Sequence, residues 1–386
     1  MENWIEISFR DSVVSRDGRP FGTGQGNRMR SAGWPLPSVV AGSLRSAVGK
    51  AAGREFSAQT GQDLLGLEVA GGLPFSEPDR TAYYPAPQDC VVRPEPSWAI
   101  LAARPQEIGG GGCDLPHAAL RPVMLADAHA GEDFKPGQAP SWWPGEKFVD
   151  WMLGTEVAFD NRFLAMPRLD ARTHVYIDPK SGAAADGKLF STTALALGLL
   201  PRYGAAEGRG FRDRYCPVRM ALRVRGEGWT AETAAKIDSL HPLGGERKLA
   251  CWEASEKNLW SCPDRLAAAL ATAKRVRMVL AAPSIFSGGW KPGWLGDDLT
   301  GKPPGADVTL RLVGVSIRRW QAVSGWSLAE PRGPKAIRRM VPAGGVYFFD
   351  VASGSAASLA NCWLEPVSDG AQECRDGFGL ATWGIW

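Results

Sequence analysis

Residues 34–53, WPLPSVVAGSLRSAVGKAAG, form the clearest helical pattern of the chain. Apolar residues recur there at helical spacing, Ser38 follows a proline as a candidate N-cap, and Gly53 stands where a helix would end. Before this helix, residues 3–9, NWIEISF, alternate apolar and polar side chains, which predicts a half-buried strand. We expect that strand at the edge of its sheet.

Strand and helix patterns continue along the rest of the chain. Strands are predicted at 171–178, 216–226, 275–286, 307–320 and 346–351, and helices at 231–240 and 263–274. Residues 189–200 fit a strand or a helix. From about residue 74 to 146, prolines and glycines interrupt every pattern, which predicts a long irregular insertion with short strands. The fold class is therefore α+β, with two mixed blocks side by side.

The composition is that of a globular protein with real cores. At 386 residues, with 44% hydrophobic and 22% charged residues, the chain is long enough for two domains. No run of about 18 apolar residues occurs, and the N-terminus lacks the layout of a signal peptide, so we expect a cytoplasmic protein. The cysteines number seven, show no CxxC pair and are expected to be reduced core residues.

Charge is distributed unevenly along the chain. Residues 272–349 hold twelve Lys or Arg against four Asp or Glu, and residues 1–54 hold eight against four, whereas the whole chain carries only +3. Clustered cations of this kind suit a polyanionic partner, because they attract phosphates and release condensed counterions. Solvated surfaces would give the same count, so composition favours nucleic acid without deciding it.

The stretch HPLGGERKLACW, residues 241–252, places two glycines directly before Glu246, Arg247 and Lys248. One interpretation is a tight turn with a solvated tip, since glycine adopts backbone angles that other residues avoid. The other is a cradle in which backbone N–H groups and adjacent cations hold a phosphate chain. The stretch alone favours the turn.

Residues 11–33 form a second candidate for contact with a polyanion. This long glycine-rich loop carries Arg16, Arg19, Arg28 and Arg30 and is predicted to be exposed. The helix that follows could add free N–H groups at Ser38 and Val39. The usual role of such a cap, however, is to close its own helix.

The C-terminal residues 377–384, GFGLATWG, are the most specific local pattern. Gly377, Gly379 and Gly384 would let the backbone approach another chain closely, while the apolar residues anchor the loop. A dinucleotide fingerprint is excluded, because no helix follows it.

The side chains that carry chemistry are few. Four histidines without ligand spacing argue against a metal site, and we expect no other cofactor. His174 could act as a general base on an RNA 2′-hydroxyl, although contact is the more common role of a single strand histidine. Several tryptophans near glycine, proline or cations could stack on bases, although most tryptophans fill cores; these are Trp34, Trp290, Trp294, Trp320 and Trp326.

Taken together, these segments resemble the family of subunit three of the Cmr complex. These subunits are RAMP-superfamily proteins of type III-B CRISPR effectors. The resemblance spans nearly the whole chain except residues 74–146. It rests on ISFRDSVVSRDGRPFG, WPLPSVVAGSLRSAVG, RTHVYIDPKSGAAADGKLF, LGGERKLACW, SIFSGGWKPGW, AVSGWSLAEPRGPKAIRRMVPAGGVYFF and GFGLATWG, in the order expected of the family.

The resemblance implies two ferredoxin-like (RRM-like) domains with long irregular insertions, which we place at 1–230 and 231–386, the second ending in the glycine loop of the RAMP signature. It implies a non-catalytic subunit that holds the 5′ repeat-derived tag of CRISPR RNA and caps the complex. Its partners would be that RNA, the large cyclase-like subunit and a backbone subunit, with target RNA met only indirectly and no membrane involved.

On this basis we expect one set of residues on RNA: Arg16, Arg19, Ser38, Arg45, Arg172, His174, Lys188, Gly244, Gly245, Arg247, Lys248 and Lys335. The two central glycines would admit the RNA backbone, and the adjacent cations would neutralise phosphates. Two alternatives remain. One is a metal-independent repeat endoribonuclease that uses His174, and the other is a protein adaptor whose basic face serves an acidic partner.

Overall fold

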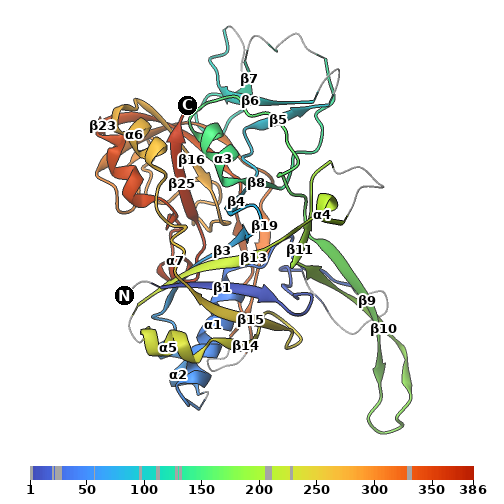
Figure 1. The fold of residues 1–386 in the computed structure, drawn as a ribbon. Helices are drawn as coiled ribbons and strands as arrows, with labels where there is room; N and C mark the ends of the chain where they lie inside the picture. Colours follow the sequence, from blue (N-terminus) through green and yellow to red (C-terminus); the bar gives the residue numbers. More distant parts are fainter. Residues whose placement is uncertain are drawn as a thin grey trace.

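The computed structural model describes residues 3–19, 21, 28–55, 57–94, 98–109, 114–126, 129, 133–204, 211–226, 229–327 and 333–386. Its described strands form two main sheets, one above the other in Figure 1, with a long hairpin projecting from the lower one. No helix within these ranges is both long and apolar enough to cross a membrane.

The first main sheet collects strands from distant parts of the chain. Its order is β14 (Ser239–Pro242), β15 (Leu249–Ser255), β1 (Asn3–Phe9), β13 (Arg219–Arg225), β3 (Glu68–Ser76), β4 (Thr81–Pro85) and β8 (Trp142–Pro144). The strand predicted at 3–9 is confirmed, but its edge position is wrong, since β15 and β13 pair with its two sides. Sequence periodicity reports which face of a strand is buried and not what lies beside it.

Helix α1 (Pro37–Ala51) covers one face of this sheet (Figure 1). Ile5 and Ile7 of β1 pack with Val40 and Leu44 of the helix in one buried cluster. The helix starts earlier than predicted: its N-cap is Leu36, without a side-chain cap, and Ser38 lies inside the first turn. Pro37 explains the shift, because proline has the backbone angle of the first helical position. Gly53 has φ of +66°, as expected after a helix end.

The second main sheet has the order β17 (Thr300–Gly301), β18 (Val308–Ser316), β23 (Val346–Gly354), β16 (Arg275–Leu280), β25 (Leu380–Ile385) and β24 (Glu365–Pro366). Strands are thus confirmed within the ranges predicted at 275–286, 307–320 and 346–351, although β16 ends at Leu280 and β18 at Ser316. α6 (Asp264–Thr272) and the 3-10 helix η2 (Ala356–Cys362) pack beside this sheet, whereas α2 (Ala58–Leu64) and α5 (Ala231–Lys236) lie beside the first. α7 (Ala371–Arg375) contacts β3 of the first sheet. Strands β14 and β15 belong to the first sheet, so that sheet extends beyond the boundary predicted at residue 230.

The predicted irregular insertion is only partly irregular. Residues 74–76 and 81–85 belong to the first sheet, and a separate small sheet contains β5 (Cys90–Arg93), β6 (Ala99–Pro105) and β7 (Val123–Leu125). Helix α3 (Gly145–Met152) follows β8. Asp89 ties this region to the second sheet: it is fully buried and accepts hydrogen bonds from Arg277 at 2.6 Å and Trp151 at 2.8 Å. Burial lowers the pKa of Arg277 to about 10.

The two main sheets meet in a seam, formed by Arg45, Asp376, Arg223, Glu365 and the glycine-rich residues 377–384. Arg45 is 6% exposed, pairs with Asp376 at 2.5 Å and donates to the carbonyl of Leu67. Arg223 pairs with Glu365 at 2.7 Å. One apolar cluster also continues from the first sheet into the second, so the two share a core.

The remaining strands form hairpins and a short pair. β9 (Arg168–Ile177) and β10 (Ala184–Ala196) make the long hairpin, with β2 (Arg28–Met29) beside β10. Residues 189–200 are therefore extended. β19 (Gln321–Val323) pairs with β22 (Arg338–Met340), and β20 (Trp326–Ser327) with β21 (Gly333–Pro334), giving a second hairpin. β11 (Leu199–Pro201) pairs with β12 (Tyr215–Pro217), next to α4 (Phe211–Arg214).

Candidate nucleic-acid interface

The glycine- and arginine-rich loop folds back on itself as a short ribbon. The amide of Asp17 donates to the carbonyl of Arg30 at 2.9 Å, and that of Ala32 donates to Ser15 at 2.7 Å. Val13 and Val14 are buried and hold the ribbon on the core. Its arginines point to solvent, and all four are exposed: Arg16, Arg19, Arg28 and Arg30.

This ribbon connects the two hairpins. Arg28 of β2 pairs with Ser191 of β10, and the amide of Gly18 donates to the carbonyl of Ala322 in β19 at 3.2 Å. A Cβ at Gly18 would stand 2.8 Å from the carbonyl carbon of Ala322, so glycine is required for this approach. The long hairpin, the ribbon and the second hairpin therefore form one continuous surface.

Exposed cations follow this surface and define a cationic belt of Arg16, Arg19, Arg28, Arg30, Lys335 and Arg339. Within the described part of the belt, Arg19 alone forms an ion pair, 3.3 Å from Asp17. Arg16 instead donates to the carbonyl of Arg19 at 2.9 Å and lies 5.6 Å from the centre of the Phe21 ring. Cations left without carboxylates are available to an external polyanion.

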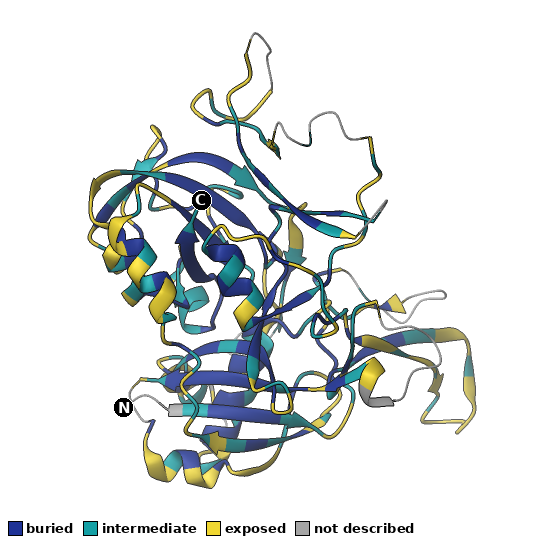
Figure 2. Ribbon diagram, turned by 45° about the horizontal axis from the view of Figure 1, so that its top comes forward, coloured by how far each residue is buried: buried dark blue, intermediate teal, exposed yellow. Residues whose placement is uncertain are grey.

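One side of the long hairpin carries polar and aromatic residues. His174 Nε2 lies 2.9 Å from Thr192 Oγ1, and its ring stacks on Phe190 with centroids 5.2 Å apart. The ammonium of Lys188 lies 4.7 Å from the Tyr176 ring. Much of this hairpin is exposed in Figure 2. The structure thus places His174 and Lys188 on one projecting element, as neighbours rather than around a cavity.

Asp170 and Arg172 lie near the base of the same side. Arg172 donates to Asp170 at 2.6 Å and 3.1 Å. The hydrogen bond from Arg172 lowers the pKa of Asp170 below its ordinary value. Glu246 and Lys248 of the turn after β14 also interact with this pair electrostatically. The predicted residues Arg172 and Lys248 are therefore brought together.

The turn of residues 245–248 joins β14 and β15 through two residues in the left-handed region. Glu246 has φ of +58° and Arg247 of +53°, as the central residues of a type I′ turn require. Asparagine and glycine normally occupy those positions, and each larger side chain there costs roughly 1–2 kcal/mol. Lys248 lies 3.6 Å from Glu246. Arg247 is exposed and forms no ion pair with the described residues.

Gly244 and Gly245 approach the chain's own ribbon. A Cβ on Gly244, whose φ is +75°, would lie 2.3 Å from the carbonyl oxygen of Val14. The amide of Gly245 donates to that carbonyl at 2.8 Å. These glycines thus have a packing role that the sequence did not suggest, and the turn interpretation of the stretch is confirmed.

Two predicted contact residues are placed away from the belt. Ser38 is half-buried in the first turn of α1, where the amide of Val39 already donates to Leu36 at 2.9 Å and is not free for an anion. Arg45 is a component of the seam, with its guanidinium used by Asp376 and by backbone carbonyls. We therefore leave both residues out of the interface.

The C-terminal glycine pattern lies inside the protein, with Gly377 and Gly379 in a turn and Gly384 in strand β25. Cβ atoms at Gly377 and Gly384 would stand 2.5 Å from the Val69 carbonyl oxygen and 2.4 Å from that of Met152. Phe378 between them is fully buried. The close approach predicted from these glycines is therefore made to β3 and α3 of the same chain.

Three of the five candidate stacking tryptophans belong to the interior. Trp34 donates to the carbonyl of Gly72 and packs against Trp142, while Trp290 and Trp294 pack against the second core. Trp320 and Trp326 are 48% and 63% exposed. Arg339, which sequence analysis missed, lies 4.8 Å from the Trp320 ring. The run of cations around Ile337 was the available signal.

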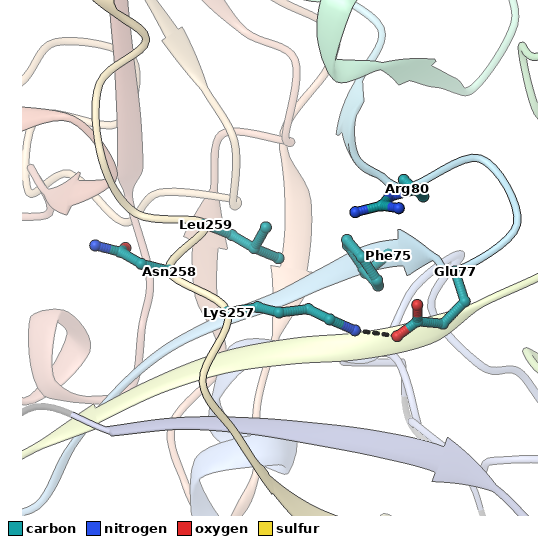
Figure 3. A pocket seen from close by; sticks show the side chains of 6 residues that line it. All are labelled: Phe75, Glu77, Arg80, Lys257, Asn258 and Leu259. Carbon is teal, nitrogen blue, oxygen red and sulfur yellow. Dashed lines mark hydrogen bonds and ion pairs between the residues drawn. The ribbon is translucent and has the colours of Figure 1, made fainter.

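A pocket of about 500 Å³ lies elsewhere, between the β3–β4 turn and residues 257–259 (Figure 3). Lys257 there lies 4.5 Å from the Phe75 ring and pairs with Glu77 and Glu6. Its lining contains the cations Arg80 and Lys257 and the carboxylate of Glu77. Among the described residues, no group of three His, Cys, Asp or Glu side chains gathers to hold a metal ion.

A family model described as "CRISPR-associated protein (Cas_Cmr3)" matches residues 5–386. The chain belongs to this family. The resemblance found in the sequence is thereby confirmed at the family level, and the match also includes the region around 74–146, where no family motif was identified. No curated protein matches the sequence.

Three solved structures with a similar chain are remote in sequence. One is a cryo-EM structure titled "Type III-B Cmr-beta bound to cognate target RNA and AMPPnP", at 11% identity over 89% of this chain and 86% of that chain, with a TM-score of 0.43. Another is the "Csm3-Csm4 subcomplex in the type III-A CRISPR-Cas interference complex", at 9% identity over 90% and 93%, with a TM-score of 0.36. A third is "a CRISPR protein from Archaeoglobus fulgidus", at 9% identity over 92% and 93%, with a TM-score of 0.27. These values are too low to transfer residue roles.

Proposed function

We propose that this protein is a non-catalytic RNA-binding subunit of a type III-B CRISPR effector, which holds the 5′ repeat-derived tag of CRISPR RNA. The observation that carries the proposal is the cationic belt, whose exposed arginines are almost free of carboxylate partners among the described residues. Family membership supplies the biological context. Unpaired cations along an extended surface suit a single strand, whose phosphates they neutralise.

Two ferredoxin-like domains form part of the proposal. The central strands of the first sheet run β15-β1-β13-β3, and those of the second run β25-β16-β23-β18. When the four strands of each set are numbered by their order in the chain, both sets have the spatial order fourth, first, third, second. All neighbouring strands are antiparallel. The repeated order supports two equivalent units. The second lacks a long helix between its first two strands, where residues 284–299 form a loop instead.

The subunit would cap the complex, beside the large cyclase-like subunit and a backbone subunit. The long hairpin supports an assembly role, because Leu169, Val175, Ile177 and Leu189 are 46% to 62% exposed on it. Apolar side chains on a projecting element signal a surface that is covered in a larger complex. Target RNA would be met only through the guide strand.

The first test measures binding of the full chain to a labelled CRISPR repeat RNA and to a scrambled RNA of equal length, in chelator. We expect tighter binding of the repeat. The double variant Arg28→Ala/Arg30→Ala should weaken binding of both RNAs and reduce the slope of log affinity against log salt by about 0.7 for each phosphate that is no longer neutralised. Equal affinity of variant and wild type would refute the belt as the RNA site.

The matched control is Arg265→Ala/Arg311→Ala. These arginines are 63% and 54% exposed and pair with Asp150 and Asp350 in the body of the protein, away from the belt. The control variant removes the same number of positive charges. Unchanged RNA affinity of the control would show that the belt arginines act through local contacts and not through the net charge of the protein.

The nuclease alternative uses His174 and predicts 2′,3′-cyclic phosphate ends without metal. The ring is held by Thr192 and Phe190, an arrangement that suits a contact residue. Denaturing gels of the same reactions decide the matter. A discrete product that His174→Ala abolishes, with binding retained, would establish the nuclease; intact RNA supports the binder.

A further inference from the structure

The second hairpin carries large apolar side chains on its surface. Trp320, Trp326 and Ile337 are 48%, 63% and 59% exposed. Elsewhere most tryptophans are placed differently: Trp143, Trp252 and Trp383 are fully buried. Exposing indole rings on a narrow two-stranded element costs solubility, and such rings usually mark a binding surface.

The side of the hairpin that carries Trp320 is also the side that meets the ribbon. Trp320 and Ala322 are two residues apart and so share one side, and Arg339 is the cross-strand partner of Ala322. The guanidinium of Arg339 accordingly lies 4.8 Å from the Trp320 ring. Ala322 contacts Gly18, between Arg16 and Arg19 of the belt. Trp320 and Arg339 thus share one side of the hairpin, next to the segment of the ribbon that carries Arg16 and Arg19.

The charge around these rings selects the ligand chemistry. Among the described residues from 318 to 340 there are five cations and no Asp or Glu; the cations are Arg318, Arg319, Lys335, Arg338 and Arg339. Arg338 alone of these forms an ion pair within the described ranges, with Glu373. A flat apolar ring beside unneutralised cations fits a nucleobase attached to a phosphodiester backbone. An apolar protein partner would not need the cations.

We propose that Trp320 and Trp326 stack on unpaired bases of a single-stranded RNA, with Arg339 and Lys335 contacting the adjoining phosphates. This stacking proposal rests on the proposed function and extends it, because the cationic belt by itself contacts only phosphates and not bases. Every base has a face that can stack, so the site contributes affinity for unpaired strands and little sequence preference.

The test separates bases from phosphates. The full chain is titrated with a fluorescent 12-nucleotide RNA and with an abasic oligonucleotide of equal phosphate count. Wild type should bind the RNA more tightly than the abasic strand. Trp320→Ala/Trp326→Ala should lose on the order of tenfold or more in RNA affinity, with affinity for the abasic strand unchanged. Trp320→Phe, which keeps a ring, should retain most of the affinity.

Trp98→Ala is the matched control. Trp98 is 55% exposed, but its ring contacts Phe159 and Tyr203 in another part of the molecule. Its loss should leave the binding of both strands unchanged. Thermal unfolding of each variant reports whether the fold is intact, and Trp320→Phe still tests the proposal if an alanine variant fails to fold.

The outcomes distinguish the two proposals. RNA binding that responds to Arg28→Ala/Arg30→Ala but not to the tryptophan variants overturns stacking and leaves the proposed function standing. Equal loss of affinity for the RNA and the abasic strand also overturns it, because the rings would then only support the belt. No binding of either strand by wild type overturns both proposals. If an acidic protein occupies the hairpin surface instead of RNA bases, RNA binding should respond to the arginine variants and not to the tryptophan variants.

Discussion

Arginine occupies two opposite environments in this molecule. In the seam between the two main sheets, Arg45 is 6% exposed, and its guanidinium donates to Asp376 and to backbone carbonyls. In the cationic belt, Arg28 and Arg30 are exposed, with no ion pair to a described residue. A buried charge must be matched inside the protein, whereas a solvated charge can be left for a partner. Carboxylate pairing, rather than arginine content, therefore separates the part that holds the fold from the part proposed to hold RNA.

The seam should give the largest effect. Asp376→Asn leaves the charge of Arg45 buried without its counterion and should lower the free energy of unfolding by about 3–5 kcal/mol. Asp350→Asn is the control, because its partner Arg311 is 54% exposed, and its effect should stay within about 1 kcal/mol. Chemical denaturation measures both. Similar losses in the two variants would erase the distinction between seam and surface.

Gly384→Ala tests the seam through packing. The added methyl would stand 2.4 Å from the Met152 carbonyl oxygen, and we expect a loss of roughly 1–3 kcal/mol in unfolding free energy. Gly42→Ala, inside α1 with nothing within 4 Å, should instead stabilise by about 0.5–1 kcal/mol. Thermal melts of the pair give the sign of each change. An unchanged unfolding free energy for Gly384→Ala would mean that the backbone of the seam shifts to accommodate the added methyl group.

A variant of the turn at Arg247 tests whether a residue that lowers the stability of the protein is retained because it binds RNA. Arg247→Gly removes the strain of a φ of +53° and should stabilise the protein by about 1 kcal/mol, while weakening RNA binding. Arg80→Gly is the matched control, since Arg80 has φ of +49° but lines the separate pocket. It should gain stability and keep its RNA affinity. Identical RNA affinity of both variants with wild type would remove Arg247 from the interface.

The smallest effect is expected at Asp170. Its pKa is lowered by the hydrogen bond from Arg172, so the carboxylate is ionised at neutral pH and masks that arginine. Asp170→Asn should raise RNA affinity a few-fold, because one unit charge at 4 Å in water is worth about 1 kcal/mol. Asp307→Asn, which frees the exposed Lys302 elsewhere, should leave affinity unchanged. Weaker RNA binding by Asp170→Asn would show that the pair itself is needed.

Local sequence patterns predicted the individual helices and strands of this fold better than they predicted which strands pair with each other. Helix α1 and strand β1 follow from periodicity, because burial on one face leaves a repeat in the sequence. Strand β9 was predicted from its composition, and β16, β18 and β23 from runs of apolar and β-branched residues. The edge position expected for β1 was wrong, since its partners β13 and β15 lie more than 200 residues away in the chain. No periodicity encodes that pairing.

The candidate site shows the same limit. Residue type alone does not show that Arg45 is buried and Arg16 exposed. Arg45 is, however, four residues from Ala41 and three from Val48, and thus falls on the buried face of α1. That position could have indicated an internal partner. The role of Gly244 against Val14 and the cation over Trp320 depend on tertiary contacts between segments far apart, and these leave no local trace.

The order of strands also bears on how the chain is made. Strand β1 can pair on both sides only after residues 219–255 have been synthesised, and β16 obtains its second neighbour only from β25, once residues 380–385 have been synthesised. The apolar faces of β1 and β16 therefore stay partly unpaired during synthesis until these later strands have emerged. Chains that stop short lack Asp376 and the glycine loop together, and should be recognised by chaperones and proteases before they can compete for a place in a complex.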